Sequence, residues 1–388
     1  MSKLDELIQE YCPDGVHHES LGDLCKIETG KLNANAAAEN GQYLFFTTAK
    51  EISRIDKYRW DTEALLIAGN ANVGDVKHYE GKFNAYQRTY VLNDFDQSIS
   101  VRFLYFFISS ALKNYLENRT NSAAMTYIVL STLQDFKVPV PPLEVQKEIV
   151  NILDKFTQLE AGLSIELDAR RRQYEYYKST LLKPSEEVGW KTIGEVCEVG
   201  DGNHSSSYPK ASEMVDQGVP FIRGTNILDG TISGKDMKYI SEEKHIKLKK
   251  GHLRANDVLV TNRGEVGKIA IIPEQFANSN LNSQIAWLRA DTKTLLPKYL
   301  FFIMNANFIQ NKIIGEGGAL KQLTIKNLKL LKIPVPSIKK QEEIVEVLDN
   351  FDTLANDKMV GIPAEIDARS QQYEYYRTKL LTFHELPV

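Results

Sequence analysis

The stretch LEVQKEIVNILDKFTQLEAGLSIELDARRRQYEYYKSTLL, residues 143–182, decides the fold of this chain. Apolar and aromatic residues recur in it at steps of three and four, which predicts one long helix with an apolar seam close to a heptad repeat. At 1.5 Å per residue, a helix of this length spans roughly 60 Å. The predicted seam comprises Ile149, Ile152, Phe156, Leu159, Leu163, Leu167, Tyr174, Tyr177 and Leu181, with Arg170 as an interruption.

The chain contains a second copy of this helix at residues 338–381. The segment QYEYY, residues 173–177, returns unchanged at 372–376. Two such helices in one chain can bury their seams on each other or on a partner, and we expect an antiparallel pair with a globular domain at each end. The predicted seam of the second copy comprises Ile344, Val347, Phe351, Leu354, Ile362, Ile366, Tyr373, Tyr376 and Leu380.

The two copies differ in their middle. The second copy has four more residues between Leu354 and Asp367, which is about one helical turn, so the seam can stay in phase. It also contains Pro363, and a proline inside a helix costs about 3 kcal/mol or more. We therefore expect a kink or a break near Pro363.

The globular segments repeat as well, although only at landmarks. LGDLC at 21–25 returns as IGEVC at 193–197, RFLYFF at 102–107 returns as KYLFFI at 298–303, and VPVP at 138–141 returns as IPVP at 333–336. This organisation predicts four segments: a first domain with an N-terminal helix at 1–142, a helix at 143–186, a second domain at 187–336 and a helix at 337–388.

Each globular segment has the sequence pattern of a mixed α/β domain. Short β-branched and aromatic runs at 43–46, 64–67, 258–260 and 268–272 predict strands, and 100–116 and 297–313 predict helices. The fold class is therefore α+β, with two mixed α/β domains joined by two long helices that form an antiparallel coiled coil.

Length and composition fit two soluble domains, because 388 residues exceed one ordinary core. The net charge is −4, but residues 190–340 hold 22 Lys and Arg against 14 Asp and Glu. Residues 1–142 hold 14 against 18. Only the second domain is basic enough to suggest a polyanion as partner.

The chain has neither a secretory signal nor a membrane span in its sequence pattern, since no apolar run approaches the roughly 20 residues required. Its cysteines, Cys12, Cys25 and Cys197, show no CxxC spacing, so neither a disulfide framework nor a zinc site is expected. Cys25 and Cys197 are expected to be buried small apolar residues. We expect a cytoplasmic protein.

Catalytic motifs are lacking. GEVGK at 264–268 resembles a phosphate loop only faintly, because its spacing is short and Ile269 stands where Ser or Thr would meet magnesium. The histidines show no metal-binding spacing, and no GxSxG occurs. We expect a chain that is not an enzyme and binds no cofactor itself.

The doubled segments VPVPPLEVQKEIVNILDKF and IPVPSIKKQEEIVEVLDNF, with DARRRQYEYYKSTLL and DARSQQYEYYRTKLL, resemble the specificity (S) subunits of type I restriction–modification systems. The resemblance covers essentially the whole chain. It implies a non-catalytic subunit in which each globular domain reads half of a bipartite, asymmetric double-stranded DNA site. It also implies that the helix pair sets the spacing and docks two methyltransferase (M) subunits. These partners use S-adenosylmethionine, and nuclease–translocase (R) subunits add ATP and Mg²⁺.

Polar side chains in the predicted loops are the candidates for DNA contact, because Arg and Lys can pair with guanine and Asn and Gln with adenine. Many such residues hold phosphates or only solvent, whereas Arg223 and Arg263 stand beside repeated segments. The candidates are Lys31, Asn70, Asn72, Lys77, His78 and Arg88 in the first domain. In the second they are His204, Ser206, Tyr208, Lys210, Arg223, Asn226, Arg263, Lys268, Asn282, Lys321 and Gln322.

The aromatic residues of the long helices are expected in the coil or at a partner surface, because helical spacing explains them better than base stacking does. They are Phe156, Tyr174, Tyr177, Phe351, Tyr373 and Tyr376. A coiled-coil scaffold or adaptor without sequence-specific DNA binding is the alternative function. An enzyme with an unrecognised site is a third.

Overall fold

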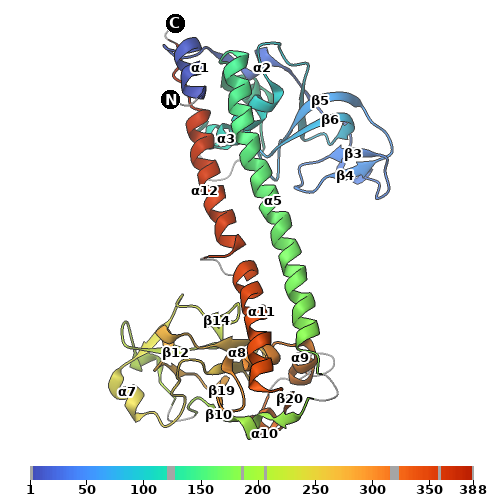
Figure 1. The fold of residues 1–388 in the computed structure, drawn as a ribbon. Helices are drawn as coiled ribbons and strands as arrows, with labels where there is room; N and C mark the ends of the chain where they lie inside the picture. The colour runs from blue at the N-terminus through green and yellow to red at the C-terminus, as the bar shows by residue number, and fades with distance from the viewer. Residues whose placement is uncertain are drawn as a thin grey trace. The chain divides into compact units, whose positions relative to one another are not determined.

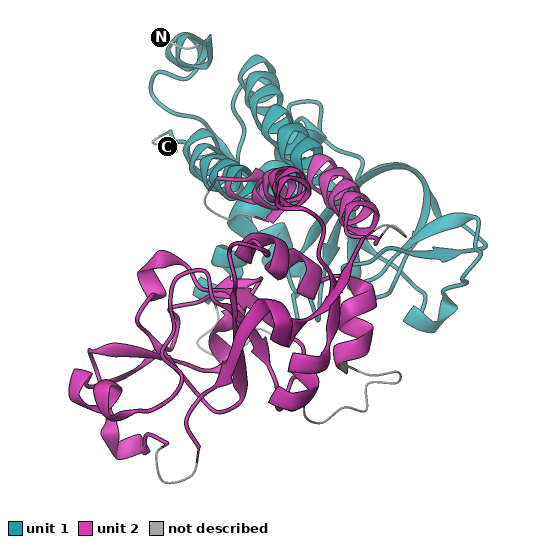
Figure 2. Cartoon of the chain, turned by 60° about the horizontal axis from the view of Figure 1, so that its bottom comes forward, with its two compact units in different colours: residues 1–164, 365–388 teal, residues 165–364 magenta. Residues whose placement is uncertain are grey.

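A computed structural model describes residues 3–119, 127–184, 188–204, 208–314, 323–356 and 360–386 (Figure 1). The chain divides into two compact units (Figure 2). Unit 1 comprises residues 1–164 and 365–388, and unit 2 comprises residues 165–364. Each unit thus contains one globular region and parts of both long helical segments, so the units cut across the four segments of the sequence.

Unit 1 is built on a six-stranded sheet in the order β2 (Lys26–Thr29), β7 (Thr89–Asn93), β5 (Trp60–Ala68), β6 (Val76–Ala85), β3 (Tyr43–Phe46) and β4 (Ser53–Ile55). β3 and β6 pair in parallel, and the other neighbouring strands of this sheet pair antiparallel. Side chains of β5 alternate between two cores, as a strand covered on both faces requires. Leu65 packs with α3 (Val101–Arg119), and Leu66 packs with a smaller aromatic cluster around Phe83.

Unit 2 repeats this topology with its sheet divided in two. The strands β10 (Cys197–Asp201), β19 (Ile285–Ala290), β16 (Val258–Thr261) and β17 (Ile269–Ile271) match β2, β7, β5 and β6. A second sheet has the order β11 (Met214–Val215), β15 (Lys238–Ile240), β12 (Val219–Ile222) and β18 (Asn280–Leu281). β12 pairs in parallel with β18, as β3 does with β6. The single strand β6 thus corresponds to β17 and β18, and Pro273, which cannot donate to a ladder, lies between them.

The helix expected at 297–313 is two helices, α8 (Pro297–Met304) and α9 (Asn307–Ile314). Asn305 lies at the break, and its Nδ2 donates to the carbonyl oxygen of Phe301 at 3.0 Å, which competes with continuing the helix. The remaining elements are α1 (Lys3–Tyr11), β1 (His18–Ser20), α2 (Leu21–Leu24), η1 (Ala34–Ala36), α4 (Leu130–Gln134), β8 (Lys137–Pro139), β9 (Trp190–Thr192), α6 (Ile193–Val196), η3 (Ala211–Glu213), η4 (Gly224–Asn226), β13 (Ile227–Leu228), β14 (Thr231–Ile232), α7 (Glu242–Lys247), η5 (Glu274–Phe276), α10 (Ile325–Leu330) and β20 (Lys332–Pro334).

The first long helix, α5 (Leu143–Leu181), has 39 residues. The second copy is broken, as predicted, into α11 (Ile338–Asn356) and α12 (Ile362–Leu380). Pro363 stands in the first turn of α12, where its missing N–H is not needed. The break therefore precedes the proline instead of bending a continuous helix around it.

The predicted seam is wrong at Leu159, whose exposed fraction is 56%. The observed seam alternates strictly between steps of four and three from the buried Ile149 and Leu153, so that Glu160 stands where Leu159 was expected. The hydroxyl of Ser370 donates to the Glu160 carboxylate. In α11 the same rule buries Leu348 and Ala355, while Val347 and Leu354, which the prediction included, are more than a third exposed.

Aromatic pairs join the helices within each unit. In unit 1, Phe156 of α5 stacks on Tyr376 of α12, with ring centroids 5.5 Å apart and an interplanar angle of 25°. In unit 2, Phe351 of α11 stacks on Tyr177 of α5 at 5.0 Å and 23°. Each pair takes its phenylalanine from one helix copy and its tyrosine from the other.

The other predicted coil aromatics lie in the same contacts. Tyr373 lies 6.3 Å from Phe156, between ring centroids. Burial, with the nearby Asp352, raises the pKa of Tyr174. In unit 1, Phe156 of α5 contacts Tyr376 of α12, and the later residue Glu160 contacts the earlier residue Ser370. The two helices therefore run antiparallel. The predicted antiparallel packing is confirmed.

A buried glutamine fixes the start of each long helix to its globular region. The Oε1 of Gln146 accepts from the backbone N–H of Ser100 at 2.7 Å, and its Nε2 donates to Pro141 O at 2.6 Å and Ser98 O at 2.8 Å. Gln341 makes the same set in unit 2, to Leu296 N, Pro336 O and Thr294 O. Both glutamines are fully buried.

All three cysteines are free and buried, and the burial of Cys25 and Cys197 was expected. Burial raises the pKa of the Cys25 and Cys197 thiols to about 12, so neither is a reactive thiolate. Within the described ranges, no helix is long and apolar enough to cross a membrane. No cluster of three or more possible metal ligands occurs in that part of the chain either.

The first prediction concerns Gln146. The substitution Gln146→Leu keeps the side-chain size but removes the side-chain partner of one buried and two part-buried backbone groups, so we expect unit 1 to lose roughly 2–4 kcal/mol of stability. Hydrogen exchange should accelerate in unit 1 and remain unchanged in residues 188–356 of unit 2. Gln158→Leu, on the exposed face of the same helix, is the control. Equal acceleration in both units would contradict this role.

The second prediction concerns a chain that ends at Pro184. It lacks α12, but residues 168–182 are the first copy of the sequence at 367–381. Because α5 is one helix, its second half cannot fold back onto Phe156, so we expect two such chains to pair and complete each other. Light scattering should give a dimer, and Tyr177→Ala should weaken it. A monomer that remains folded would contradict the pairing.

Candidate nucleic-acid interface

Hydrogen bonds bring four loops of unit 1 together, and we call them loop surface 1: residues 30–36, 47–52, 69–75 and 86–88. Backbone hydrogen bonds join them, from Gln87 N to Leu32 O at 2.9 Å, from Tyr86 N to Phe46 O at 2.9 Å and from Gly69 N to Arg88 O at 2.8 Å. Gly30 allows the closest approach, because a Cβ there would lie 2.0 Å from Ala85 O.

The structure gives the predicted residues of this surface different surroundings. Lys31 and Arg88 are exposed. Asn70 is half-buried, and its Oδ1 has no hydrogen-bond partner. The amide of Asn72 donates to Thr48 O at 2.7 Å, and the ammonium of Lys77 donates to Ala49 O at 3.1 Å and to Asp75 at 2.9 Å. Asn72 and Lys77 therefore hold the loop at 47–52, whereas Lys31 and Arg88 face solvent.

His78 points to α3 rather than to a loop. Its Nε2 lies 2.8 Å from Glu63 Oε1, and its Nδ1 lies 3.5 Å from the guanidinium of Arg102. Arg102 in turn binds Asp154 of α5. His78 thus belongs to a polar chain that links the sheet to the long helix.

Unit 2 has a corresponding loop surface 2, formed by residues 202–204, 223–226, 262–268 and 282–284. Asn282 N donates to Ile222 O, and Asn262 N donates to Gln284 O, each at 2.9 Å. A Cβ on Gly202 would lie 2.4 Å from Asn282 O, so a glycine is required there as well.

One turn is the same in both surfaces although its sequence differs. Ala71 has a φ of 56° and Gly264 a φ of 74° at equivalent positions. Gly74 N donates to Ala68 O, and Gly267 N donates to Thr261 O, each at 2.9 Å. The residues that precede the positive φ are Asn70 in unit 1 and Arg263 in unit 2. One backbone conformation therefore presents an amide in one unit and an exposed guanidinium in the other.

Among the other candidates of unit 2, Lys210 and Lys268 are exposed, and Lys268 pairs with Glu265. His204 binds Asp201 at 2.7 Å, and the Tyr208 ring lies 5.7 Å from that of Phe221, between centroids. The structure does not describe three further candidates, Ser206, Lys321 and Gln322.

Three predicted residues shape loop surface 2 from inside. Asn226 is 1% exposed, accepts from Arg223 N and donates to the carbonyl oxygens of Ser233 and Lys235. The Arg223 guanidinium donates to Asp236 O at 2.7 Å. Asn282 is 6% exposed and accepts from Gln284 N. Their side chains already have backbone partners.

The loop at 47–52 contains none of the residues predicted from the sequence. It follows β3 as residues 223–226 follow β12, and its Lys50 is exposed. The available signal was the position of Arg223 after a repeated strand, because the same position in the first domain is the run TTAK at 47–50.

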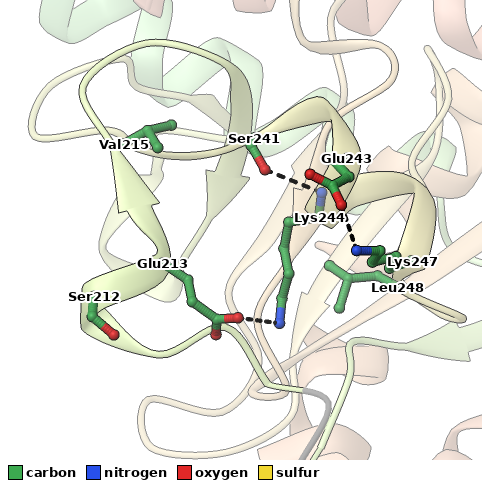
Figure 3. Close-up of a pocket in the computed structure, with 8 residues that line it drawn as sticks. All are labelled: Ser212, Glu213, Val215, Ser241, Glu243, Lys244, Lys247 and Leu248. Atoms are coloured by element: carbon green, nitrogen blue, oxygen red, sulfur yellow. Dashed lines mark hydrogen bonds and ion pairs between the residues drawn. The ribbon is translucent and has the colours of Figure 1, made fainter.

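A hollow of about 540 Å³ lies beside α7, and its charged side chains form ion pairs within it (Figure 3). Lys244 pairs with Glu213 at 2.8 Å, and Lys247 pairs with Glu243 at 2.5 Å. The Oγ of Ser241 accepts from Lys244 N. The charged side chains of this hollow thus pair with one another.

Comparison with known proteins matches the repeat of a globular segment and a helix that the sequence shows. A family model described as type I restriction modification DNA specificity domain matches residues 13–169 and 186–368. The chain is 35% identical over 271 residues to the Escherichia coli type I restriction enzyme EcoR124I/EcoR124II specificity subunit, covering 66% of this chain and 65% of that one. It is 32% identical over 344 residues to a Haemophilus influenzae protein whose name assigns it the same role, covering 85% of each chain.

Solved structures share the fold. The S subunit of a type I restriction–modification system from M. genitalium superposes with a TM-score of 0.61 at 17% identity, covering 94% of this chain and 96% of that one. The HsdS subunit from Thermoanaerobacter tengcongensis gives 0.52 at 15%, covering 96% and 97%. Because the family model matches both globular regions and well over half of the chain, the chain belongs to the type I restriction–modification specificity subunits.

Proposed function

We propose that this chain is the non-catalytic, sequence-specific DNA-binding subunit of a type I restriction–modification complex, and that each loop surface reads one half of a bipartite asymmetric site. The observation that carries the proposal is the shared turn with different side chains. Asn70 and Arg263 occupy equivalent positions in turns of the same backbone conformation, one in each unit. Because their side chains differ, the two units would prefer different bases.

The proposed readout divides the candidates by exposure. In unit 1, Lys31, Arg88 and Asn70 would approach the bases, and in unit 2, Arg263 and Lys268 would. Arg can pair with guanine through two hydrogen bonds, and Asn can pair with adenine. Lys210 and Lys50 would hold phosphates, which sets affinity and register. Asn72, Lys77, Arg223, Asn226 and Asn282 would preserve the shape of the loops.

The long helices would set the spacing and dock two methyltransferase subunits. Equivalent apolar residues on them are exposed, Tyr176 at 64% and Tyr375 at 62%. Leu159 and Leu354 are a second such pair, at 56% and 38%. In each pair, one residue belongs to unit 1 and the other to unit 2. Each unit therefore presents the same kinds of exposed apolar residue, which supports the docking of two copies of one partner. The methyltransferase subunits would use S-adenosylmethionine, and the nuclease subunits would use ATP and Mg²⁺. The complex would work in the cytoplasm.

These exposed apolar residues also suit the second candidate, a coiled-coil adaptor that does not read DNA. The two functions differ in what the loop surfaces must do. Charge reversal at Arg263 and Arg88 should leave an adaptor's partner binding and its role intact, whereas it should abolish sequence-specific methylation by a reader.

The third prediction concerns methylation in the host. Single-molecule sequencing should find a bipartite adenine motif that disappears when this chain is deleted and returns when it is supplied. Copurification with a methyltransferase subunit is expected under the same proposal. A methylome that is unchanged by the deletion would sink the assignment.

The fourth prediction separates the two half-sites. Arg263→Ala should cost about 1–3 kcal/mol in specific binding and relax the motif in one half only, because one loop surface loses a base contact. Arg88→Ala should relax the other half. Lys137→Ala, an exposed change on β8, is the control. Binding titrations and methylome motifs measure both, and relaxation of the same half by both changes would refute the division.

A further inference from the structure

Unit 2 contains a cavity of about 650 Å³ between α8, α11 and the strand β14. Figure 1 shows α11 beside α8 in this unit. The apolar wall of the cavity includes Ile271 and Phe301, and its polar wall includes Lys298, Asp349 and Asp352. Lys298 and Asp349 form an ion pair at 2.6 Å, with side chains that are 39% and 43% exposed, so the cavity opens to solvent beside them.

The internal repeat shows what the corresponding place in unit 1 holds. Arg102 is the counterpart of Lys298, and Asp154 is the counterpart of Asp349. The Arg102 guanidinium donates twice to Asp154 Oδ1, at 2.6 and 3.0 Å. It also lies over the rings of Tyr105 and Phe106, at 4.9 and 4.7 Å from their centroids. In unit 1 a guanidinium thus fills the space between a carboxylate of the long helix and the aromatic side of α3.

Three differences leave this space open in unit 2. Lysine ends in a compact ammonium instead of a planar guanidinium. His78, which lies beside Arg102 in unit 1, is replaced by Ile271 at the same register, since β6 pairs His78 with Leu65 and β17 pairs Ile271 with Val258. Tyr105 is replaced by Phe301, which keeps an aromatic ring at the wall.

Unit 2 also carries a carboxylate that unit 1 lacks. Asp352 follows Asp349 by three residues, and the counterpart of Asp352 is Thr157. Asn356 donates to Asp352 Oδ1 at 2.9 Å, which holds this carboxylate at the cavity wall. Asp349 and Asp352 together exceed the single charge of Lys298. The open space is therefore bounded by an aromatic ring and an excess of negative charge.

We propose that this cavity binds an arginine side chain of a partner polypeptide that lies along α11. A guanidinium is planar, stacks on aromatic rings and pairs with carboxylates through two hydrogen bonds, which fits Phe301 and the aspartates. The chain itself places this group at the equivalent position of unit 1. The open mouth lets a side chain enter while its backbone stays outside.

The fifth prediction tests this site on the full chain with two small probes, N-acetyl-arginine methylamide and N-acetyl-lysine methylamide, in ligand-observed NMR titrations. The arginine probe should bind in the millimolar range and about tenfold more tightly than the lysine probe, because only the guanidinium can pair and stack at once. Equal binding of the two probes, or no binding of either, would overturn the proposal.

Two variants locate the binding. Lys298→Arg supplies the cavity with a guanidinium from its own α8, so the arginine probe should lose about tenfold in affinity while the fold is preserved. Asp352→Asn should lose a similar factor without filling the space. Arg102→Lys is the matched control in unit 1 and should leave the affinity unchanged. Wild-type affinity in Lys298→Arg would show that the probe binds elsewhere and would end the proposal.

Discussion

The stacked pairs Phe156–Tyr376 and Phe351–Tyr177 are the contacts on which the architecture depends. Each joins the first half of one helix copy to the second half of the other. The first globular region therefore cannot cover α5 with the segment that directly follows it, because α5 is one continuous helix whose second half belongs to unit 2. The buried glutamines Gln146 and Gln341 complete the arrangement by fixing each helix start to a globular region.

The loop surfaces combine a fixed backbone with variable side chains. The bonds that hold the shared turn run between main-chain groups, from Gly74 to Ala68 and from Gly267 to Thr261. Such bonds do not depend on side-chain identity, so Asn70 and Arg263 can differ without a change in the scaffold. A subunit that binds two different half-sites needs loops whose conformation is held by the backbone, so that the side chains in contact with DNA can differ.

The sequence predicted the elements well and the partners of side chains poorly. The helix break was foreseen because Pro363 leaves few alternatives, and residues 43–46 were foreseen as a strand because their pattern is unambiguous. The seam failed at Leu159, since apolar identity was weighed above strict heptad spacing and the polar Glu160 was passed over. The roles of Asn72 and Asn226 could not be foreseen, because their partners are the backbone carbonyl oxygens of Thr48 and Ser233, which no sequence motif marks as acceptors.

The composition of unit 1 has a consequence for synthesis on the ribosome. Its globular region is made before residues 165–364, but α12, which contacts the first half of α5, is made only after them. At about 5–20 residues per second, this interval lasts roughly 10–40 s. During that time, Phe156 and its neighbours wait uncovered, while unit 2 can finish as soon as α11 emerges. The globular region of unit 1 is therefore translated before unit 2, yet unit 1 completes its folding after unit 2. In the interval, α12 of a second nascent chain could pack on the uncovered part of α5.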